Sequence, residues 1–362
     1  MRRVDVTTDD RSGGPPHVLV AGAGIAGIAA ALRLRALSPA CRITLVDAAV
    51  RLGGKIDGEI VAGCVVDGGA DVCIGPKLRS THMFADLALG ERLVRVNPNG
   101  LRTYEKRDGA LVPAATQVQE ELVTFPGGMR ELVDAACAGL HDVTVVTNTA
   151  VEKLAREGAV WKAEAGSVSY TADAVILALP ASSAAHLLAG IVEAEARDLC
   201  TLEYPATTTV TMAWQASDVP RPLDGTGYLV TDPSAVVTAC TWTSSKIPSH
   251  ATAGIVLVRG YVRGDAAAAS AAVFAELTSV LGVTERPLFT RMYEWPGGIP
   301  VYTSAHEANV HALTDVLAPI QSIFVAGSAF HGVGIPDCIA SGERAAEGAA
   351  AYLTGHTDTI ES

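Results

Sequence analysis

The chain has 362 residues, of which 49% are hydrophobic and 18% are charged, and its formal net charge is −12. This composition is typical of a compact protein with one large or two ordinary domains, and it excludes a long disordered chain. The acidic balance has no basic stripe to offset it, so it argues against a nucleic-acid partner and does not help binding to an anionic membrane surface.

The N-terminus and the cysteines bear on the compartment. Residues 1–15 lack the apolar middle of a secretory signal, so we expect a polar, disordered tail. No uninterrupted apolar run approaches the roughly 20 residues of a membrane-spanning helix. The seven cysteines are odd in number and form no C-x-x-C pair, which indicates reduced, mostly buried thiols and no metal site. We therefore expect a cytoplasmic protein without stable membrane association.

The stretch VLVAGAGIAGIAAAL, residues 18–32, predicts a strand, a glycine turn and a helix. Gly22, Gly24 and Gly27 have the G-x-G-x-x-G spacing that lets a pyrophosphate rest on a helix N-terminus. Gly22 permits the tight turn, Gly24 lets the backbone approach the phosphate closely, and Gly27 lets helix pack on strand. Such turns also close ordinary βα units, so the motif alone leaves that alternative open.

A second strand, RITLVD at residues 42–47, ends in an acid. Asp47 follows Gly27 by 20 residues, where a carboxylate accepts hydrogen bonds from an adenosine ribose. This spacing strengthens the prediction of a dinucleotide site.

The segment AAVRLGGKI, residues 48–56, predicts a flexible loop beside the pyrophosphate. Its glycine pair, Gly53 and Gly54, is flanked by the cations Arg51 and Lys55. A solvated surface loop is the alternative interpretation.

The remaining pattern predicts more elements in chain order. Residues 143–151 form a strand that returns to the nucleotide sheet, and after two hairpin strands AVILALPA is a buried strand. Strands in succession follow from about residue 202, and then a helix from Asp265 to about Leu281. Residues 286–295 return the chain to the cofactor domain. Strands in series suggest a mixed or antiparallel second layer that holds the substrate.

The order of motifs resembles the flavin-dependent amine oxidase superfamily: GAGIAG, then an acid, then RLGGK, then the DGGAD that ends at Asp71. The segment AGSAFHGVGIPDCIASGERAA, residues 326–346, resembles the signature of protoporphyrinogen and coproporphyrinogen oxidases, and residues 241–248 and 295–306 also resemble stretches of that branch. The resemblance implies FAD as the cofactor. It implies an α/β fold with a Rossmann-like FAD-binding domain and a smaller mixed-sheet substrate domain.

Both domains are expected to be discontinuous in sequence. The FAD-binding domain is predicted over residues 16–80, 123–200 and 295–355, and the substrate-binding domain over residues 81–122 and 201–294.

The motifs and the resemblance together assign a set of cofactor contacts, among them backbone contacts of Val151 with the adenine and of the C-terminal turn with the flavin. Trp295 contacts the flavin or closes the core. The predicted contacts are Gly22, Gly24, Ile25, Ala26, Gly27, Asp47, Arg51, Gly53, Gly54, Lys55, Gly69, Ala70, Asp71, Val151, Trp295, Gly327, Ser328, Val333, Gly334 and Ile335.

One departure from the family is large. In the family a helical insertion follows the hairpin at residues 100–114, sits on membranes and covers part of the substrate cavity. Here only TQVQEELV separates that hairpin from FPGGMRELVDAACAGL, which resembles the family's next helix. The short connection implies a soluble enzyme with a more open or smaller site.

The last predicted helix begins after FHGVGIPDC, and its N-terminus is expected to point at the pyrimidine edge of the flavin. A positive helix end stabilises the anionic reduced flavin. His331 in this turn is the candidate for acid/base catalysis, although hydride abstraction can proceed without a protein base. His306 is expected to be a structural hydrogen-bond partner. Cys338 either packs or, at a helix N-terminus, reacts, and packing is the more common role.

The propionates of a porphyrinogen require cations in the pocket. Lys77, Arg102 and Lys246 are the candidates, with Arg79 beside the first, and Lys246 can also be read as a solvated hairpin lysine.

The predicted function is an FAD-dependent oxidase that takes hydride from a ring carbon of a tetrapyrrole precursor, with dioxygen as the acceptor. A small cyclic amine or partly reduced heterocycle is the alternative substrate, and a non-catalytic FAD or porphyrin carrier is a further alternative. The oligomeric state is left open.

Overall fold

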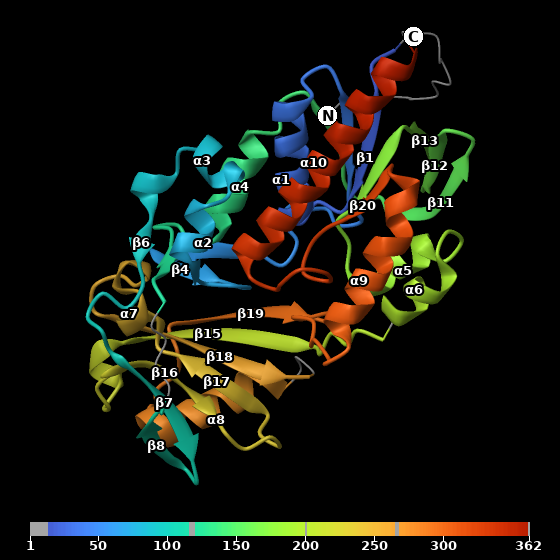
Figure 1. The fold of residues 1–362 in the computed structure, drawn as a ribbon. Coiled ribbons are helices and arrows are strands. Elements are labelled where there is room, and N and C mark those ends of the chain that lie inside the picture. The colour runs from blue at the N-terminus through green and yellow to red at the C-terminus, as the bar shows by residue number, and fades with distance from the viewer. Residues whose placement is uncertain (1–13, 116–119, 200, 265–267, 361–362) are drawn as a thin grey trace.

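Two large sheets organise the molecule, and they lie in different parts of it (Figure 1). The computed structural model describes residues 14–115, 120–199, 201–264 and 268–360. Except for Gly14 and Pro15, the tail expected at residues 1–15 lies outside these ranges.

The first sheet has five parallel strands in the order β10-β2-β1-β14-β20. They are β1 (His17–Ala21), β2 (Arg42–Val46), β10 (Val143–Val146), β14 (Ala174–Leu177) and β20 (Ile323–Val325). The chain moves outward from β1 to β2 and β10, and then crosses back to β14 on the other side of β1. The strand order therefore reverses at β1, and the turn after β1 lies at the crevice where such sheets bind ligands.

Two helices, α1 (Ile25–Leu37) and α10 (Ile335–Ile360), pack on one face of this sheet (Figure 1). Gly342 allows α10 to approach α1 closely, because a Cβ at that position would stand 2.0 Å from the carbonyl oxygen of Ala26. The sequence of α1 allows the same close approach. Its first seven residues are all buried, and five of them are alanine or glycine.

The opposite face is covered by a second layer with its own core. This layer consists of β11 (Val151–Glu157), β12 (Val160–Ala165), β13 (Val168–Ala172), α5 (Ala181–Leu188), α6 (Glu193–Leu199) and α9 (His306–Leu317). The prediction of one strand over residues 143–151 is wrong in part, because only residues 143–146 join the nucleotide sheet. Asn148, with a φ of +55°, turns the chain, and Val151 begins the antiparallel sheet β11-β12-β13. We call the first sheet and both of its covers the nucleotide region.

The second large sheet has seven strands in the order β19-β15-β18-β17-β16-β7-β8, and it is mixed because β16 pairs with β7 in parallel. Its strands are β7 (Arg102–Arg107), β8 (Ala110–Pro113), β15 (Thr207–Gln215), β16 (Gly225–Val230), β17 (Val237–Thr241), β18 (Ile255–Arg263) and β19 (Phe289–Trp295). Helix α8 (Ala269–Leu281) covers its apolar face, where Val273 lies so close that a Cβ on Gly260 would be 2.6 Å from it. The other face carries polar side chains and is turned toward the nucleotide region (Figure 1).

Residues 286–295 do not return the chain to the nucleotide region as expected. They form β19, which pairs with β15 at the edge of the second sheet. The alternation in this stretch explains the result, because Phe289, Arg291, Tyr293 and Trp295 lie on one face of the strand, as period-two patterns require.

Smaller elements connect the two sheets. They are β3 (Gly58–Val61), β4 (Cys64–Asp67), β5 (Cys73–Ile74), β6 (Val94–Arg95), β9 (Leu122–Thr124), α2 (Gly75–Arg79), α3 (His82–Asp86), α4 (Arg130–Ala138), α7 (Thr243–Lys246) and 3₁₀ turns at Gly90–Arg92, Ala216–Asp218, Pro248–His250 and Ala318–Ile320. Residues 114–121 are the whole connection from β8 to β9, and residues 116–119 of it lie outside the described ranges.

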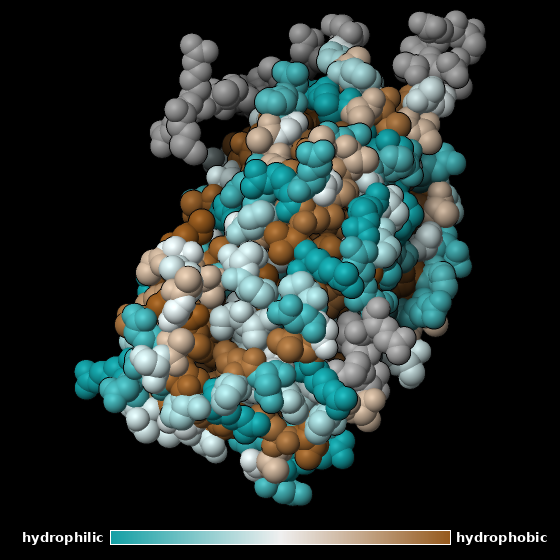
Figure 2. Space-filling view, turned by 90° about the vertical axis from the view of Figure 1, so that its left-hand side faces the viewer, coloured by the Kyte–Doolittle hydropathy of each residue, from teal (hydrophilic) through white to brown (hydrophobic). Residues whose placement is uncertain are grey.

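The predicted α/β architecture, with a Rossmann-like sheet and a mixed second sheet, is confirmed. The predicted domain boundaries stay predictions; β7 and β8 belong to the second sheet, whereas α3 packs on α1 and α10. None of the helices in the part of the chain that the structure describes has the length and apolar composition needed to cross a bilayer. On the face shown in Figure 2, hydrophobic residues form patches among hydrophilic ones.

Candidate flavin site

The glycine turn after β1 has the backbone geometry that a phosphate site needs. A Cβ on Gly22, whose φ is +98°, would stand 2.2 Å from the carbonyl oxygen of Ala178, and a Cβ on Gly27 would stand 1.8 Å from that of Gly22. Packing within the protein therefore requires both glycines. At Gly24 a Cβ would meet nothing nearer than 4.0 Å, so this position is open space over the helix N-terminus. The arrangement fits a pyrophosphate that approaches the backbone at Gly24.

The start of α1 has unused hydrogen-bond donors. Gly24 is the N-cap residue and offers no side chain, and the first turn carries no acidic residue. The N–H groups of Ile25 and Ala26, both buried in the helix, have no intrahelical acceptor at this position. An anion is therefore favoured here by both the donors and the helix dipole.

Asp47 stands at the end of β2 beside this turn, as predicted. Its Oδ2 accepts a hydrogen bond from the backbone N–H of Ala23, and its Oδ1 accepts one from that of Ala49 at 2.7 Å. The carboxylate therefore holds the glycine turn in place. Because each carboxylate oxygen has a second lone pair, it can still accept from a ribose hydroxyl.

The loop with Gly53 and Gly54 lies directly on the glycine turn. Gly53 donates its N–H to the carbonyl oxygen of Ala23 at 2.8 Å and forms a bridge with Gly24. A Cβ on Gly54 would stand 3.1 Å from the Cα of Gly24. The two loops therefore pack on each other at the start of α1, and their contact with a phosphate stays a prediction.

The two cations of that loop have different roles. Arg51 donates to three carbonyl oxygens of its own loop and lies 3.3 Å from Asp57, so it shapes the loop. Lys55 donates to the carbonyl oxygen of Gly298 and lies 4.8 Å from the centre of the Tyr204 ring. Burial lowers the pKa of Lys55. The interpretation of a solvated surface loop is therefore wrong for Lys55, whose amino group reaches the segment after β19.

Residues 67–71 form a loop, and side chains of the second sheet hydrogen-bond to one face of it, which we call the held face. The carbonyl oxygen of Gly68 accepts from Thr209 Oγ1 at 2.8 Å and from Trp295 Nε1 at 3.0 Å. Ala70 is exposed, so the loop reaches the surface there, whereas Gly69 is half-buried and its Cβ position is only 1.9 Å from the carbonyl oxygen of Lys55. Trp295 thus supports this loop from β19, and a direct contact of its indole with the flavin stays a prediction.

Behind the held face lies a buried cluster of charges. Asp71 and Lys246 form an ion pair of 2.9 Å, and the side chains are only 14% and 15% exposed. Arg259 donates to the carbonyl oxygens of the same loop. The alternative of a solvated hairpin lysine is wrong, because Lys246 ends the short helix α7 and is paired. Lys246 and Arg259 hold the pKa of Asp71 down to about 2.

Two further members of this cluster are Asp67 and His250. Burial, together with the charge of Asp71, raises the pKa of Asp67 to about 7. His250 is fully buried, its Nε2 lies 2.9 Å from the carbonyl oxygen of Phe125, and burial lowers its pKa. Sequence reasoning missed Asp67, His250 and Arg259; the one available signal was a lone arginine inside the apolar run GIVLVRGYV.

The C-terminal turn at residues 327–335 is fastened by a tyrosine that sequence reasoning also missed. Tyr302 Oη donates to the carbonyl oxygen of Ser328 at 2.7 Å and accepts from the N–H of Gly332 at 3.0 Å. The ring of His306 stacks on that of Tyr302, with centres 3.8 Å apart. At the start of the turn, Gly327 has a φ of +105°, and its Cβ would meet only Ala26, at 3.7 Å. Val333 and Gly334 complete the turn, and Ile335 begins α10.

The two histidines near this turn differ in environment. His331 lies at the surface, and its pKa is lowered by partial burial and by the proximity of Arg344 and of two other histidines, His311 and His306. The imidazole is therefore neutral at pH 7, and its role in acid/base catalysis stays a prediction. His306 bonds the backbone of Phe330, which supports the expected structural role.

Cys338 packs in the first turn of α10. Its side chain is 8% exposed, and burial raises the pKa of the thiol to about 12. Both observations support packing over reactivity. Cys41, Cys64, Cys73, Cys137 and Cys240 are also free thiols, and Cys200 lies outside the described residues.

The three cations predicted to bind the substrate, Lys77, Arg102 and Lys246, differ in their partners. Lys77 pairs with Asp337 at 3.1 Å, Lys246 pairs with Asp71, and Arg102 is exposed at the start of β7. Arg79 pairs with Glu121. Exposed apolar side chains occur at Val333, in the C-terminal turn, and at Ile299 and Val301, just before Tyr302.

A cavity of about 740 Å³ lies elsewhere, among β7, the turn that follows β7, β16, β17 and α8. None of the predicted site residues lines it, and the ion pair of Lys106 with Glu276 stands in its wall. Among the described residues, no group of three or more histidine, cysteine or acidic side chains could hold a metal ion.

Known proteins resemble this chain in both sequence and fold. The family model described as flavin containing amine oxidoreductase matches residues 110–350, and that of an NAD(P)-binding Rossmann-like domain matches residues 20–87. The coproporphyrinogen III oxidase of Bacillus subtilis is 28% identical over 279 residues, which are 74% of this chain and 57% of that protein. That of Propionibacterium freudenreichii is 34% identical over 250 residues, 66% of this chain and 46% of that protein. The chain thus spans about half the length of these relatives.

Solved structures share the fold. A candidate protoporphyrinogen oxidase from Exiguobacterium superposes with a TM-score of 0.83 at 21% identity, covering 94% of this chain and all of that one. Cyclohexylamine oxidase from Brevibacterium oxydans superposes with a TM-score of 0.74 at 13% identity, covering 96% of this chain and all of that one. The family model covers more than half of the 362 residues. The chain therefore belongs to the flavin containing amine oxidoreductase family, whose members are flavin-dependent oxidoreductases.

Proposed function

We propose that the protein is an FAD-dependent oxidase that removes hydride from a ring carbon of a porphyrinogen-type substrate, with dioxygen as the acceptor. The observation that carries this proposal is the glycine cradle at the N-terminus of α1, where three separate segments meet: Gly24 is open, Gly54 packs on it with a Cβ position 3.1 Å from its Cα, and the Cβ position of Gly327 lies 3.7 Å from Ala26. The names of the curated relatives, coproporphyrinogen III oxidases, support the substrate class.

The chain's own residues would bind and orient the two reactants. The N–H groups at the start of α1 would face the pyrophosphate, and Asp47 would accept from the ribose. The loop at residues 69–71, which is exposed at Ala70, and the turn that Tyr302 fastens would face the reactive ring. When bound, the flavin supplies the hydride acceptor. His331, neutral at pH 7, could accept the proton that a substrate nitrogen loses.

A small cyclic amine is a second candidate substrate. Residues 114–121 are the whole connection between β8 and β9, so the chain has no long segment there to enclose a large substrate. The fold is also shared with cyclohexylamine oxidase, although a likeness at 13% identity carries the fold alone.

Anaerobic mixing separates these possibilities. We expect the purified protein to carry flavin, and its visible absorbance to bleach with coproporphyrinogen III but not with cyclohexylamine or putrescine. Bleaching by an amine alone would select the second substrate. A tight porphyrin complex without bleaching would favour a carrier, and a protein that takes up no flavin would overturn the proposal.

A further inference from the structure

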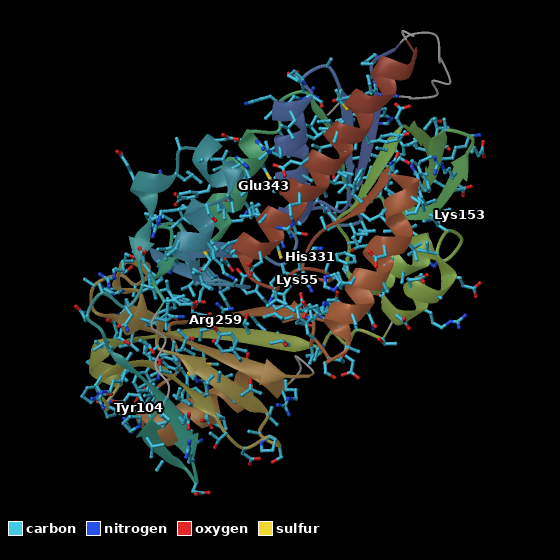
Figure 3. All side chains as sticks on the ribbon, viewed as in Figure 1. Lys55, Tyr104, Lys153, Arg259, His331 and Glu343 are labelled. Carbon is cyan, nitrogen blue, oxygen red and sulfur yellow. The ribbon has the colours of Figure 1, made fainter. Side chains whose placement is uncertain are left out.

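Arg259 is a buried arginine that neither the glycine motifs nor the predicted contacts include. It lies in β18 on the polar face of the second sheet, and it is 3% exposed (Figure 3). Figure 3 shows it between the second sheet and the nucleotide region, whereas Tyr104 lies near the far edge of the molecule. Two residues along the strand, Tyr261 shares its face, and the guanidinium lies 4.8 Å from the centre of that ring.

The guanidinium holds the loop at residues 67–71 from behind. Its Nη2 donates to the carbonyl oxygen of Gly68 at 3.2 Å and to that of Gly69. Nε and Nη1 have no hydrogen-bond partner among the residues that the structure describes. Burying unpartnered donors is unfavourable, so stability alone does not explain an arginine at this position.

The cluster around Arg259 has a surplus of positive charge. Arg259 and Lys246 are the cations, and Asp71 is a firmly ionised carboxylate because both cations lower its pKa. Burial raises the pKa of Asp67 to about 7, so this carboxyl is partly neutral at pH 7. Burial lowers the pKa of His250, so this imidazole is neutral at pH 7. Two positive charges thus face one full negative charge and a fraction of another.

This charge lies one peptide layer behind an open surface. Arg259 bonds the carbonyl oxygens of Gly68 and Gly69, and the next residue of the loop, Ala70, is exposed. Because the guanidinium is already covered by protein, a ligand on the loop cannot touch it. Its influence on that ligand is therefore electrostatic, and it acts through a medium of low polarisability.

The geometry points to Arg259 as a positioning residue of the flavin site, which fixes the loop at residues 67–71 and favours the reduced, negatively charged form of a flavin resting on it. This inference rests on the proposed function. It adds a source of positive charge besides the N-terminus of α10. It also assigns a role to the unpartnered Nε and Nη1 of Arg259, because no acceptor atom next to them offsets their positive charge.

The test is the reduction potential of the flavin in the purified holoprotein, measured by equilibration with a reference dye. For Arg259→Met we expect the ratio of reduced to oxidised flavin at a fixed potential to fall about tenfold or more, equivalent to about 30 mV for two electrons. Lys246→Met should lower the ratio without touching the loop carbonyls, and Arg259→Lys should keep most of it. Arg291→Met is the matched control. Arg259 in β18 and Arg291 in β19 lie opposite the same residue of β15, Thr211, but the side chain of Arg291 is 39% exposed and forms an ion pair with Glu59.

The outcomes separate the two proposals. A wild-type protein that takes up no flavin would overturn the proposed function itself. If flavin binds and Arg259→Met leaves the potential within twofold of the Arg291→Met control, the inference about Arg259 fails and the proposed function stands. If Arg259→Met does not fold, Lys246→Met and Arg259→Lys decide, since a purely structural role predicts the same potential for both.

Discussion

The five-stranded sheet and the seven-stranded sheet contribute to the site in opposite ways. The first is buried on both faces, and it contributes backbone at its carboxyl end, where the turn at Gly22 and Gly24 meets the loop at Gly53. The second buries one face under α8 and turns polar side chains toward the nucleotide region, among them Arg259 and Trp295. A cofactor between the two sheets would therefore meet mainly backbone from the five-stranded sheet and a loop held by side chains from the seven-stranded sheet.

This difference decides what a substitution does. On the backbone side, adding a Cβ at an open position blocks the ligand, and adding one at a packed position disrupts the fold. On the side-chain side, a substitution changes charge or removes a hydrogen bond while the backbone stays in place.

The largest effect is expected at Gly24. Its φ of −67° and ψ of 175° suit any residue, and a Cβ there meets no protein atom nearer than 4.0 Å, so Gly24→Val places its Cβ in the space left for the ligand. We expect flavin affinity to fall by about a hundredfold or more, with little change in unfolding temperature. Titration of apoprotein with FAD measures it. Gly190→Val is the control, because Gly190 is exposed and nothing lies within 4 Å of its Cβ position. Equal affinities in the two variants would contradict the cradle.

The next effect is on packing in the nucleotide region. At Gly342 a Cβ would stand 2.0 Å from the backbone of Ala26, so Gly342→Ala must push α10 away from α1. We expect a loss of about 2–4 kcal/mol in the free energy of unfolding, measured with urea. Gly355→Ala in the same helix has nothing within 4 Å of its Cβ position and should stabilise the protein by about 0.5–1 kcal/mol. A harmless Gly342→Ala would show that the two helices can separate.

The third effect isolates the charge cluster of the second sheet through pH. Asp67 has a pKa of about 7 in the folded protein, above its ordinary 3.8, so its contribution to stability is complete below pH 4 and is lost as pH rises through 7. Asp67→Asn keeps an oxygen that can accept from the N–H of Met129, which Oδ1 of Asp67 bonds at 2.8 Å. We expect the variant to gain about 4 kcal/mol over the wild type between pH 4 and 8, since each unit of pKa shift corresponds to about 1.4 kcal/mol.

Asp232→Asn is the control for that pH series. Asp232 is exposed, and hydrogen bonds from Ser234 lower its pKa, so its contribution is already complete above pH 4 and this difference stays flat. His250 titrates in the opposite direction in an overlapping range. Its Nδ1 lies 3.7 Å from Oδ2 of Asp67, so the measured difference reports the coupled titration of Asp67 and His250. A flat difference for Asp67→Asn would show that Asp67 is ionised throughout.

The same division explains what the sequence could predict. The nucleotide sheet, the cradle glycines and Asp47 follow from local spacing, because a strand, a tight turn and a helix start leave few choices of residue. The roles of Lys246, Arg259 and Tyr302 depend on side-chain contacts between segments that are far apart in the sequence. Tyr302 bonds Ser328, which follows it by 26 residues, and Lys246 pairs with Asp71 across 175 residues. The spacing of residues within one helix or strand cannot predict contacts over such separations in sequence.

The smallest effect is expected at Tyr302, where a side chain of the segment after β19 holds the backbone of the nucleotide region. Tyr302→Phe removes the hydroxyl that bridges Ser328 and Gly332 but keeps the ring that stacks on His306. We expect a loss of about 1 kcal/mol in the free energy of unfolding. Hydrogen exchange should increase at residues 328–335, where Tyr302 fastens the turn, and stay unchanged at Gly327, because Oγ of Ser341 accepts from the N–H of Gly327 at 3.0 Å. Tyr170→Phe, in the antiparallel sheet of β13, should leave exchange in the turn unchanged. Faster exchange across the whole molecule in Tyr302→Phe would mean that the tyrosine serves the fold rather than the turn.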